Sequence, residues 1–282
     1  MERSPGVGEL DGRVALITGA ARGQGRSHAV AMAEAGADVV VTDICADIGS
    51  VPYALAAVHD LEETAHLVEK SGRRALAVEA DVRNRDAMGV AVAQAIAELG
   101  KVDIVVANAG ICGFGLMPEL TEPQWDDMLA VNLTGVFNTF RAVVPHMIER
   151  RYGRLVATSS GAGRTGAPNL SHYAATKWGV IGFVKSVALE VAAHGITANV
   201  VCPATVDTPM VHNEALYSLF APDIEAPSKE AVRPRYEAMN PMRVAWLDPQ
   251  EISNAVLFLA SDRSAFISGE TIEVSAGGSA QR

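Results

Sequence analysis

A tyrosine and a lysine four residues apart, Tyr173 and Lys177, follow a serine, Ser160, in the stretch SSGAGRTGAPNLSHYAATK. If the segment after Ser171 is helical, the spacing places Tyr173 and Lys177 on one face, one turn apart. A phenol with an ordinary pKa of about 10 is a poor base near neutrality, but a neighbouring ammonium favours the phenolate and lowers that pKa. Tyr173 could then exchange a proton with an alcohol or a carbonyl, while Ser160 offers its hydroxyl to the same oxygen. A surface tyrosine and lysine on an ordinary helix would show the same spacing, so the rest of the chain must decide.

Short apolar, β-branched runs alternate with stretches of helical periodicity along the chain. This alternation predicts a doubly wound, Rossmann-type α/β fold, in which helices cover both faces of a parallel sheet and ligands bind at the carboxyl ends of the strands. The length of 282 residues fits a single domain. We expect a flexible N-terminal tail over residues 1–10 and one catalytic domain over residues 11–282. The expected strands are residues 13–18, 38–42, 75–78, 102–107, 155–158, 196–201 and 271–274.

Composition argues against several classes of partner. The net charge of -10 repels phosphate backbones and anionic lipid, which leaves nucleic-acid and membrane-surface binding with little support. The N-terminus carries charges where a signal peptide needs an apolar core. Cys45, Cys112 and Cys202 are widely spaced and match no metal-ligand pattern, as is typical of plain thiols in a reducing cytoplasm. The sequence therefore predicts a cytoplasmic protein without a metal site.

A glycine-rich turn, TGAARGQG, follows the first expected strand and opens a helix. In this context glycines let backbone amides approach a pyrophosphate at the helix N-terminus. Asp43 ends the next expected strand, where a carboxylate would bind the adenosine ribose hydroxyls. The same carboxylate would repel a 2'-phosphate, whereas Arg22 in the turn could pair with one. We give Asp43 more weight, because it would contact the ribose itself while Arg22 can turn to solvent, and so the sequence favours NAD over NADP.

Together these motifs resemble the short-chain dehydrogenase/reductase family, and the resemblance extends over about residues 11–278. It implies that Tyr173 is the catalytic acid/base and that Lys177 lowers its pKa and binds the nicotinamide ribose. It also implies that Ser160 orients the substrate oxygen and that Asn132 holds a water molecule linking Lys177 to solvent. The resemblance assigns the cofactor to Gly19, Arg22, Gly23, Gln24, Gly25, Asp43, Asp81, Val82, Asn108, Ala109, Gly110, Tyr173, Lys177, Pro203, Val206 and Thr208.

The sequence departs from the family pattern at one position, where Ala204 follows Pro203 in place of the usual glycine. Val206 and Thr208 are still placed to meet the nicotinamide carboxamide. A methyl group narrows the backbone angles open to residue 204. We expect altered cofactor affinity and not lost binding.

The stretch GAARGQGRSHAVAMAEAGADVVVTDIC and the long connection after it are similar to the carveol dehydrogenase type, the actinobacterial branch called mycofactocin-coupled. Residues 46–59 form an extra loop in this comparison, near the adenine end of the cofactor. In that branch NAD is thought to stay bound and to pass its hydride to a peptide-derived carrier, mycofactocin. The resemblance implies a tightly bound, non-exchanging NAD covered by the extra loop, and a homotetramer formed through the apolar helices expected at residues 125–148 and 173–191.

The substrate is expected under an irregular lid, residues 209–247, which is rich in proline. Three arginines of the lid, Arg233, Arg235 and Arg243, could bind an anion but fit solvated side chains better. The lid and the segment after the fourth strand supply apolar side chains, namely Met210, Leu216, Leu219, Phe220, Met239, Met242 and Trp246, together with Ile111, Phe114 and Leu116.

An apolar pocket favours a hydrophobic secondary alcohol, such as a terpenoid, oxidised to its ketone by NAD. One alternative is an NADPH-dependent carbonyl or ketoacyl reductase, and Asp43 counts against it. The other is a protein that senses dinucleotides without turnover. An intact set of Asn132, Ser160, Tyr173 and Lys177 argues against a sensor, which has no use for an activated phenol.

Overall fold

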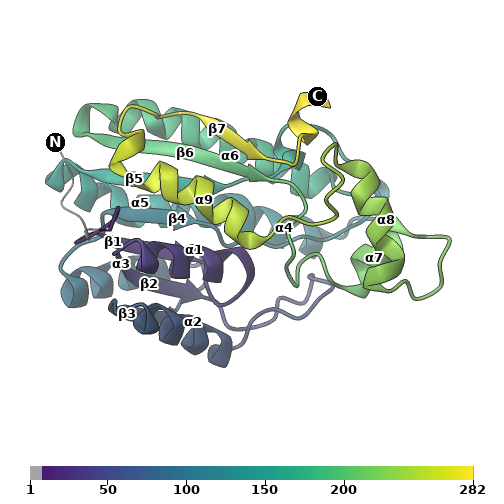
Figure 1. The fold of residues 1–282 in the computed structure, drawn as a ribbon, viewed down its shortest axis with the longest axis horizontal. Helices are drawn as coiled ribbons and strands as arrows, with labels where there is room; N and C mark the ends of the chain where they lie inside the picture. Colours follow the sequence, from purple (N-terminus) through teal and green to yellow (C-terminus); the bar gives the residue numbers. More distant parts are fainter. Residues whose placement is uncertain (1–7, 282) are drawn as a thin grey trace.

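Seven parallel strands form one sheet in the order β3-β2-β1-β4-β5-β6-β7 in the computed structural model, which describes residues 8–281 (Figure 1). The winding reverses between β1 and β4, which are neighbours in the sheet although β2 and β3 lie between them in sequence. Such a reversal opens a crevice at the carboxyl ends of the strands. The strands are β1 (Val14–Thr18), β2 (Asp38–Asp43), β3 (Ala75–Glu79), β4 (Ile104–Ala107), β5 (Gly153–Thr158), β6 (Ile196–Pro203) and β7 (Thr271–Val274). The predicted fold class and every predicted strand are confirmed.

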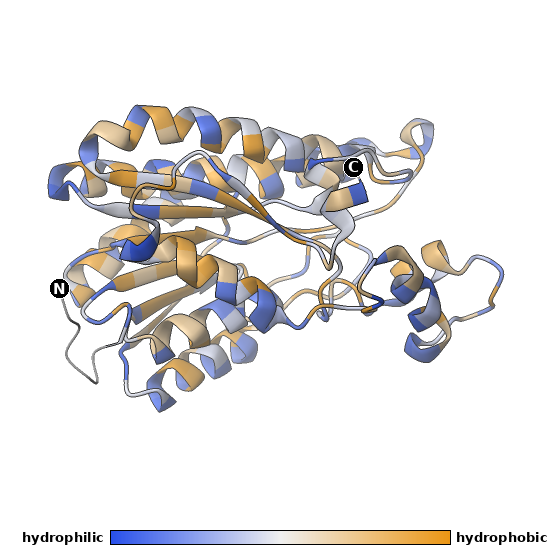
Figure 2. Cartoon of the chain, turned by 45° about the horizontal axis from the view of Figure 1, so that its top comes forward, coloured by the Kyte–Doolittle hydropathy of each residue, from blue (hydrophilic) through white to orange (hydrophobic). Residues whose placement is uncertain are grey.

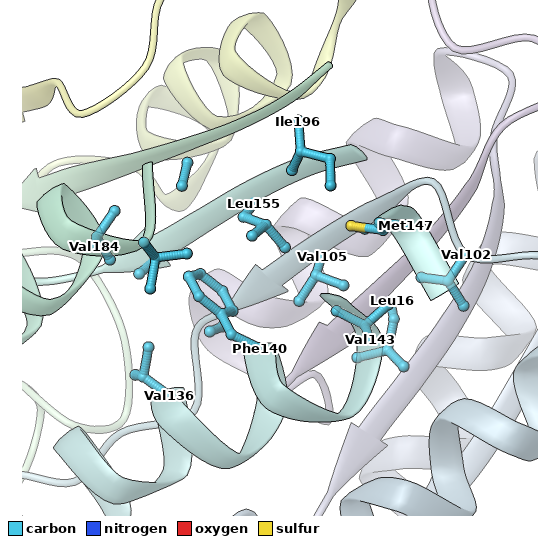
Figure 3. Close-up of a cluster of buried hydrophobic side chains, with 14 of the residues drawn as sticks. Leu16, Val102, Val105, Val136, Phe140, Val143, Met147, Leu155, Val184 and Ile196 are labelled. Atoms are coloured by element: carbon cyan, nitrogen blue, oxygen red, sulfur yellow. The ribbon is translucent and has the colours of Figure 1, made fainter. Parts of the chain in front are cut away.

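Two groups of helices cover the sheet. On one face Phe140, Val143 and Met147 pack against Leu155 and other strand side chains (Figure 3). The helices that cover the two faces each carry both hydrophobic and hydrophilic residues, as expected of a helix with one buried side (Figure 2). The helices on that face are α3 (Arg85–Leu99), α5 (Gly135–Arg150) and α6 (Ser171–Val191), and those on the other are α1 (Gly23–Glu34), α2 (Val58–Lys70) and α9 (Pro249–Ala260).

The helix expected over residues 125–148 is interrupted. Helix α4 (Glu122–Leu129) continues into a π-helical turn, Ala130–Thr134, and then into α5. Single π-helical turns are rare and often occur at functional sites. This one contains Asn132.

The lid is more regular than the sequence suggested. It carries two short helices, α7 (Glu214–Phe220) and α8 (Lys229–Met239), which lie together beyond the carboxyl ends of the strands (Figure 1). Their apolar side chains form a separate small cluster that includes Tyr217, Tyr236 and Trp246. The lid therefore has a core of its own.

Two expected boundaries need correction. Leu10, assigned above to the tail, is buried, and its backbone N–H donates to the Ala35 carbonyl (2.8 Å). Residues 1–7 of that tail lie outside the described residues. The extra loop spans residues 44–57, because α2 already begins at Val58 and includes His59. Among residues 8–281, no helix is long and apolar enough to span a bilayer.

Candidate active site

A cavity of about 840 Å³ opens at the carboxyl ends of the strands. The glycine-rich turn, the extra loop and the lid all contribute to its wall. Every residue predicted to hold the cofactor lines it, and so does Ser160. Asn132 does not line the cavity. The structure thus brings together segments from residue 19 to residue 281.

The glycine-rich turn leaves the start of α1 open toward the cavity. Gly19 and Gly23 have positive φ angles of 65° and 57°, which favour glycine. A Cβ on Gly19 would lie 2.7 Å from the Cα of Ala109, so the neighbouring strand ends approach too closely for a side chain. No side chain caps the first turn of α1 among the described residues. Its first N–H groups remain available to an anion such as a pyrophosphate.

Asp43 lies at the end of β2 and joins two parts of the cofactor site. One carboxylate oxygen accepts a hydrogen bond from the backbone N–H of Ala21 (3.1 Å), and the other accepts from the N–H of Cys45 (3.3 Å). Arg22 also lines the cavity and is partly exposed. One N–H of its guanidinium donates to the carbonyl of Ala54 in the extra loop (2.6 Å). This bond links the glycine-rich turn to the extra loop.

Tyr173 and Lys177 lie one turn apart on α6, as their spacing predicted. The Lys177 Nζ is 5.5 Å from the centre of the Tyr173 ring and donates to the Thr158 carbonyl at the end of β5 (3.0 Å). Ser160 follows the same strand and forms a hydrogen bond with Tyr173. Strand β5 and helix α6 thus hold a hydroxyl, a phenol and an amine around one point of the cavity.

Burial controls the protonation of these groups in this structure. It raises the pKa of Tyr173 well above its usual value, and the hydrogen bond with Ser160 opposes that shift only in part. Burial also lowers the pKa of Lys177 to about 8. The structure therefore does not show the expected fall in the Tyr173 pKa, because desolvation of the phenolate dominates.

Asn132 acts on the backbone behind the site. Its amide oxygen accepts from the N–H of Ile111 (2.8 Å), and its amide nitrogen donates to the carbonyl of the same residue (2.9 Å). This paired contact joins the π-helical turn to the segment after β4. A water-holding role for Asn132 stays a prediction.

The loop after β6 accommodates the unusual alanine. The N–H of Ala204 donates to the Val274 carbonyl (2.9 Å), and Ala204 does not have a positive φ angle. A Cβ is therefore tolerated without backbone strain. The hydroxyl of Thr208 donates to the carbonyl of Val206 (3.3 Å), which closes this loop on itself. The effect on cofactor affinity stays a prediction.

The substrate end of the cavity is apolar, but fewer residues line it than the sequence predicted. Leu116 and Met242 are exposed, and Trp246 packs inside the lid. Arg233, Arg235 and Arg243 do not line the cavity, and the first two pair with Glu237 (3.3 Å) and Asp223 (2.6 Å). The predicted side chains that do line it are Met210, Leu216, Leu219, Phe220, Met239, Ile111 and Phe114.

Several cavity residues were missed by the sequence analysis. The hydroxyl of Tyr53 accepts from the N–H of Cys112 (3.0 Å). This bond links the extra loop to the segment after β4. Burial raises the pKa of the Cys112 thiol to about 12. All three cysteines are free thiols, as expected. The other missed wall residues include Tyr236 and Asn240 from the lid and Ser275, Gly278 and Gln281 from the C-terminal segment.

The family model described as short chain dehydrogenase matches residues 13–216. The chain belongs to this family. It is 42% identical to (-)-trans-carveol dehydrogenase of Rhodococcus erythropolis, over 96% of this chain and 99% of that protein. It superposes with a TM-score of 0.95 on carveol dehydrogenase from Mycobacterium avium, solved in complex with NAD, at 43% identity over 97% of this chain and 99% of that one. It is also 34% identical to a 3-oxoacyl-acyl-carrier-protein reductase of Staphylococcus epidermidis, over 93% of this chain and 97% of that protein.

Proposed function

We propose that this protein is an NAD-dependent alcohol dehydrogenase that converts a hydrophobic secondary alcohol, such as a terpenoid, to its ketone. The observation that carries the proposal is the arrangement of Ser160, Tyr173 and Lys177 around one point of a cavity whose substrate end is apolar. The similarity to carveol dehydrogenases supports the same substrate class.

The preference for NAD rests on Asp43. The Asp43 carboxylate lines the cavity beside the glycine-rich turn, where it would accept hydrogen bonds from ribose hydroxyls and repel a 2'-phosphate. Arg22, the nearby cation, is bound to Ala54. The alternative is an NADPH-dependent carbonyl or ketoacyl reductase, and the Asp43 carboxylate counts against it. The similar carveol dehydrogenase from Mycobacterium avium was solved with NAD.

Ser160, Tyr173 and Lys177 each have a separate role in the transfer of one proton. Ser160 orients the substrate oxygen, and Tyr173 accepts the hydroxyl proton of the alcohol. When bound, NAD supplies the hydride acceptor and a positive ring charge that favours the phenolate form of Tyr173. Lys177, with its pKa lowered to about 8, can exchange a proton near neutral pH and holds the Thr158 end of β5 in place. A dinucleotide sensor would not need this arrangement.

The extra loop supports a cofactor that stays bound between turnovers. Its side chains Ile48, Tyr53 and Leu55 line the cavity, and three hydrogen bonds fasten the loop to the body of the protein. A cofactor under such a cover would pass its electrons to an external carrier, and we propose mycofactocin in that role.

Assembly into a cytoplasmic homotetramer is also part of the proposal. Helices α5 and α6 leave large apolar side chains in contact with solvent, with exposed fractions of 43% for Phe137, 51% for Trp178 and 84% for Leu189. Burying these side chains against another copy of the chain would remove apolar surface from water.

Replacing Tyr173 by phenylalanine tests the proposed reaction. Tyr173→Phe should reduce turnover of a secondary terpene alcohol at least about 100-fold, because it removes the proton acceptor. NAD content, measured by mass spectrometry of the denatured protein, should remain that of the wild type. Tyr152→Phe is the matched control, since the Tyr152 hydroxyl pairs with Asp262 (2.9 Å), a residue that does not line the cavity. A Tyr173→Phe enzyme that keeps more than about a tenth of the wild-type rate would refute the assignment.

A further inference from the structure

One hydroxyl in the lid has no partner. Tyr236, on α8, is only 1% exposed and lines the cavity. Its hydroxyl oxygen is shielded from solvent and forms no hydrogen bond with any residue that the structure describes. Buried phenol groups usually have a hydrogen-bond partner, because an unpaired polar group in the interior is costly.

The lid holds the Tyr236 ring in place. The ring of Phe220 packs at 4.8 Å from it and the ring of Trp246 at 5.7 Å, measured between ring centres. Val232 and Ala221 complete the cluster. These contacts fix the orientation of the ring within the core of the lid.

Tyr236 lines the same cavity as the catalytic groups. It belongs to α8 of the lid, whereas Ser160 follows β5 and Tyr173 lies on α6. The lid and the catalytic elements thus contribute phenol groups to one cavity.

The polar groups near Tyr236 form no hydrogen bond with its hydroxyl. The amide of Asn240 donates to the Val244 carbonyl (2.7 Å), and Nε1 of Trp246, whose ring packs on Tyr236, is also buried and unpaired among the residues that the structure describes. Tyr217 in the same cluster is different, because its hydroxyl is paired with Nδ1 of His212 (2.6 Å). The lid thus contains two buried tyrosines, one paired within the protein and one not.

We propose that the Tyr236 hydroxyl binds a second oxygen atom of the substrate. The preferred substrate is then a hydrophobic secondary alcohol that carries a further hydroxyl or keto group away from the reacting carbon. The reacting oxygen lies at Ser160 and Tyr173, and the second oxygen accepts a hydrogen bond from the lid. This inference rests on the proposed function, since it concerns the same site, and it adds a second point of recognition to it.

Matched pairs of alcohols test the inference. The substrates are cyclohexane-1,2-diol, 1,3-diol and 1,4-diol, each compared with the methylcyclohexanol in which a methyl group replaces the second hydroxyl. Tyr236→Phe should lower kcat/KM for at least one diol roughly five- to tenfold while changing its methyl partner less than about twofold, as expected for one lost hydrogen bond. Tyr217→Phe, the control, removes a paired hydroxyl from the same cluster and should affect diol and methyl partner equally. Equal effects of Tyr236→Phe on both members of every pair would overturn the inference.

Thermal stability gives an independent result. Tyr236→Phe removes an unpaired buried hydroxyl and should leave Tm unchanged or raise it, whereas Tyr217→Phe breaks the contact with His212 and should lower Tm. A fall in Tm for Tyr236→Phe as large as that for Tyr217→Phe would mean that the Tyr236 hydroxyl is already paired, and would overturn the inference. If the wild type oxidises none of the alcohols, the proposed function fails as well, whereas equal effects within each pair overturn only the role of Tyr236.

Discussion

Two segments, the extra loop and the lid, cover one cavity, and these two covers are attached to the protein in different ways. The extra loop, residues 44–57, covers the cofactor half and is fastened along its length. Ala54 accepts from Arg22 of the glycine-rich turn, Ser50 donates to Asp127 of α4 (2.7 Å), and Tyr53 accepts from the segment after β4. Each bond reaches a different part of the body of the protein. The loop can leave the cavity only if these contacts break together.

The lid over the substrate half is attached at its base and by one bond to the C-terminal segment, from the N–H of Met242 to the Ala276 carbonyl (3.1 Å). Helices α7 and α8 pack chiefly against each other. At the base of the lid the N–H of Leu247 donates to the Thr205 carbonyl (2.9 Å), and the Asp207 side chain contacts His212 and Lys229. A segment with its own core and few contacts outside its base can move as one body. This difference indicates that the cofactor half of the cavity retains NAD, whereas the substrate half opens to exchange alcohol and ketone.

Removing the hydrogen bonds of Ser50 and Tyr53, two of the three that hold the extra loop, should produce the largest change, a faster release of NAD. In the double variant Ser50→Ala and Tyr53→Phe, two hydrogen bonds worth about 1 kcal/mol each are lost, so NAD should dissociate roughly 30-fold faster. Mass spectrometry of the nucleotide retained after timed dialysis measures this rate. Tyr217→Phe in the lid is the control and should retain NAD like the wild type. Equal retention by the double variant and the wild type would mean that the loop does not hold the cofactor.

Changing Asp43 should alter the preference of the cofactor site, beneath the extra loop, for NAD over NADP. Asp43→Ala removes the carboxylate that would repel a 2'-phosphate, so the ratio of kcat/KM with NADP to that with NAD should rise about tenfold or more, a shift of at least about 1.4 kcal/mol. Steady-state rates with each added cofactor give this ratio. Asp47→Ala is the matched control, because Asp47 accepts from the N–H of Leu55 within the loop (2.7 Å) and does not line the cavity. A ratio that moves equally in both variants would show that Asp43 does not face the ribose.

The sequence predicted the sheet and the floor of the site because their signals are local. Each strand is a short β-branched run, and the spacing of Tyr173 and Lys177 on a helix fixes their common face. Gly19 and Gly23 mark positions that need positive φ angles. None of these features depends on a distant part of the chain.

The covers were harder to predict because their contacts join distant segments. Tyr53 and Cys112 lie 59 residues apart, and no periodicity connects them. The two lid helices did have a local signal. Asn213 and Ser228 cap their first turns, accepting from Leu216 (2.9 Å) and Ala231 (3.3 Å), but the prolines of the segment, including Pro234 inside α8, suggested irregular structure.

Burial of the catalytic groups also could not be read from spacing. The four-residue interval predicts that the amine and the phenol are neighbours, but it does not show that Lys177 is buried and Tyr173 partly buried. Their loss of hydration depends on the packing of distant segments around them. Desolvation raises the Tyr173 pKa and lowers that of Lys177, which is the opposite of what proximity alone predicts for the phenol.

The contacts of His212 at the base of the lid provide the test with the smallest expected effect, because their loss should alter the lid and not the extra loop. His212 bonds to the Asp207 carboxylate through Nε2 and to the Tyr217 hydroxyl through Nδ1, and its ring packs 4.9 Å from that of Trp246. His212→Phe keeps an aromatic ring there but removes both hydrogen bonds. Because the closed lid is then less stable by about 1 kcal/mol, KM for the alcohol should rise roughly fivefold.

Retention of NAD should stay unchanged in His212→Phe, because no anchor of the extra loop is altered. Lys229→Met is the control, since the exposed pair between Lys229 and Asp207 (3.1 Å) contributes little, and KM should change less than about twofold. Initial rates against alcohol concentration, together with the dialysis measurement, separate the two covers. If His212→Phe released NAD as fast as the double variant of the extra loop, the covers would open as one unit, and the division between retention and exchange would be wrong.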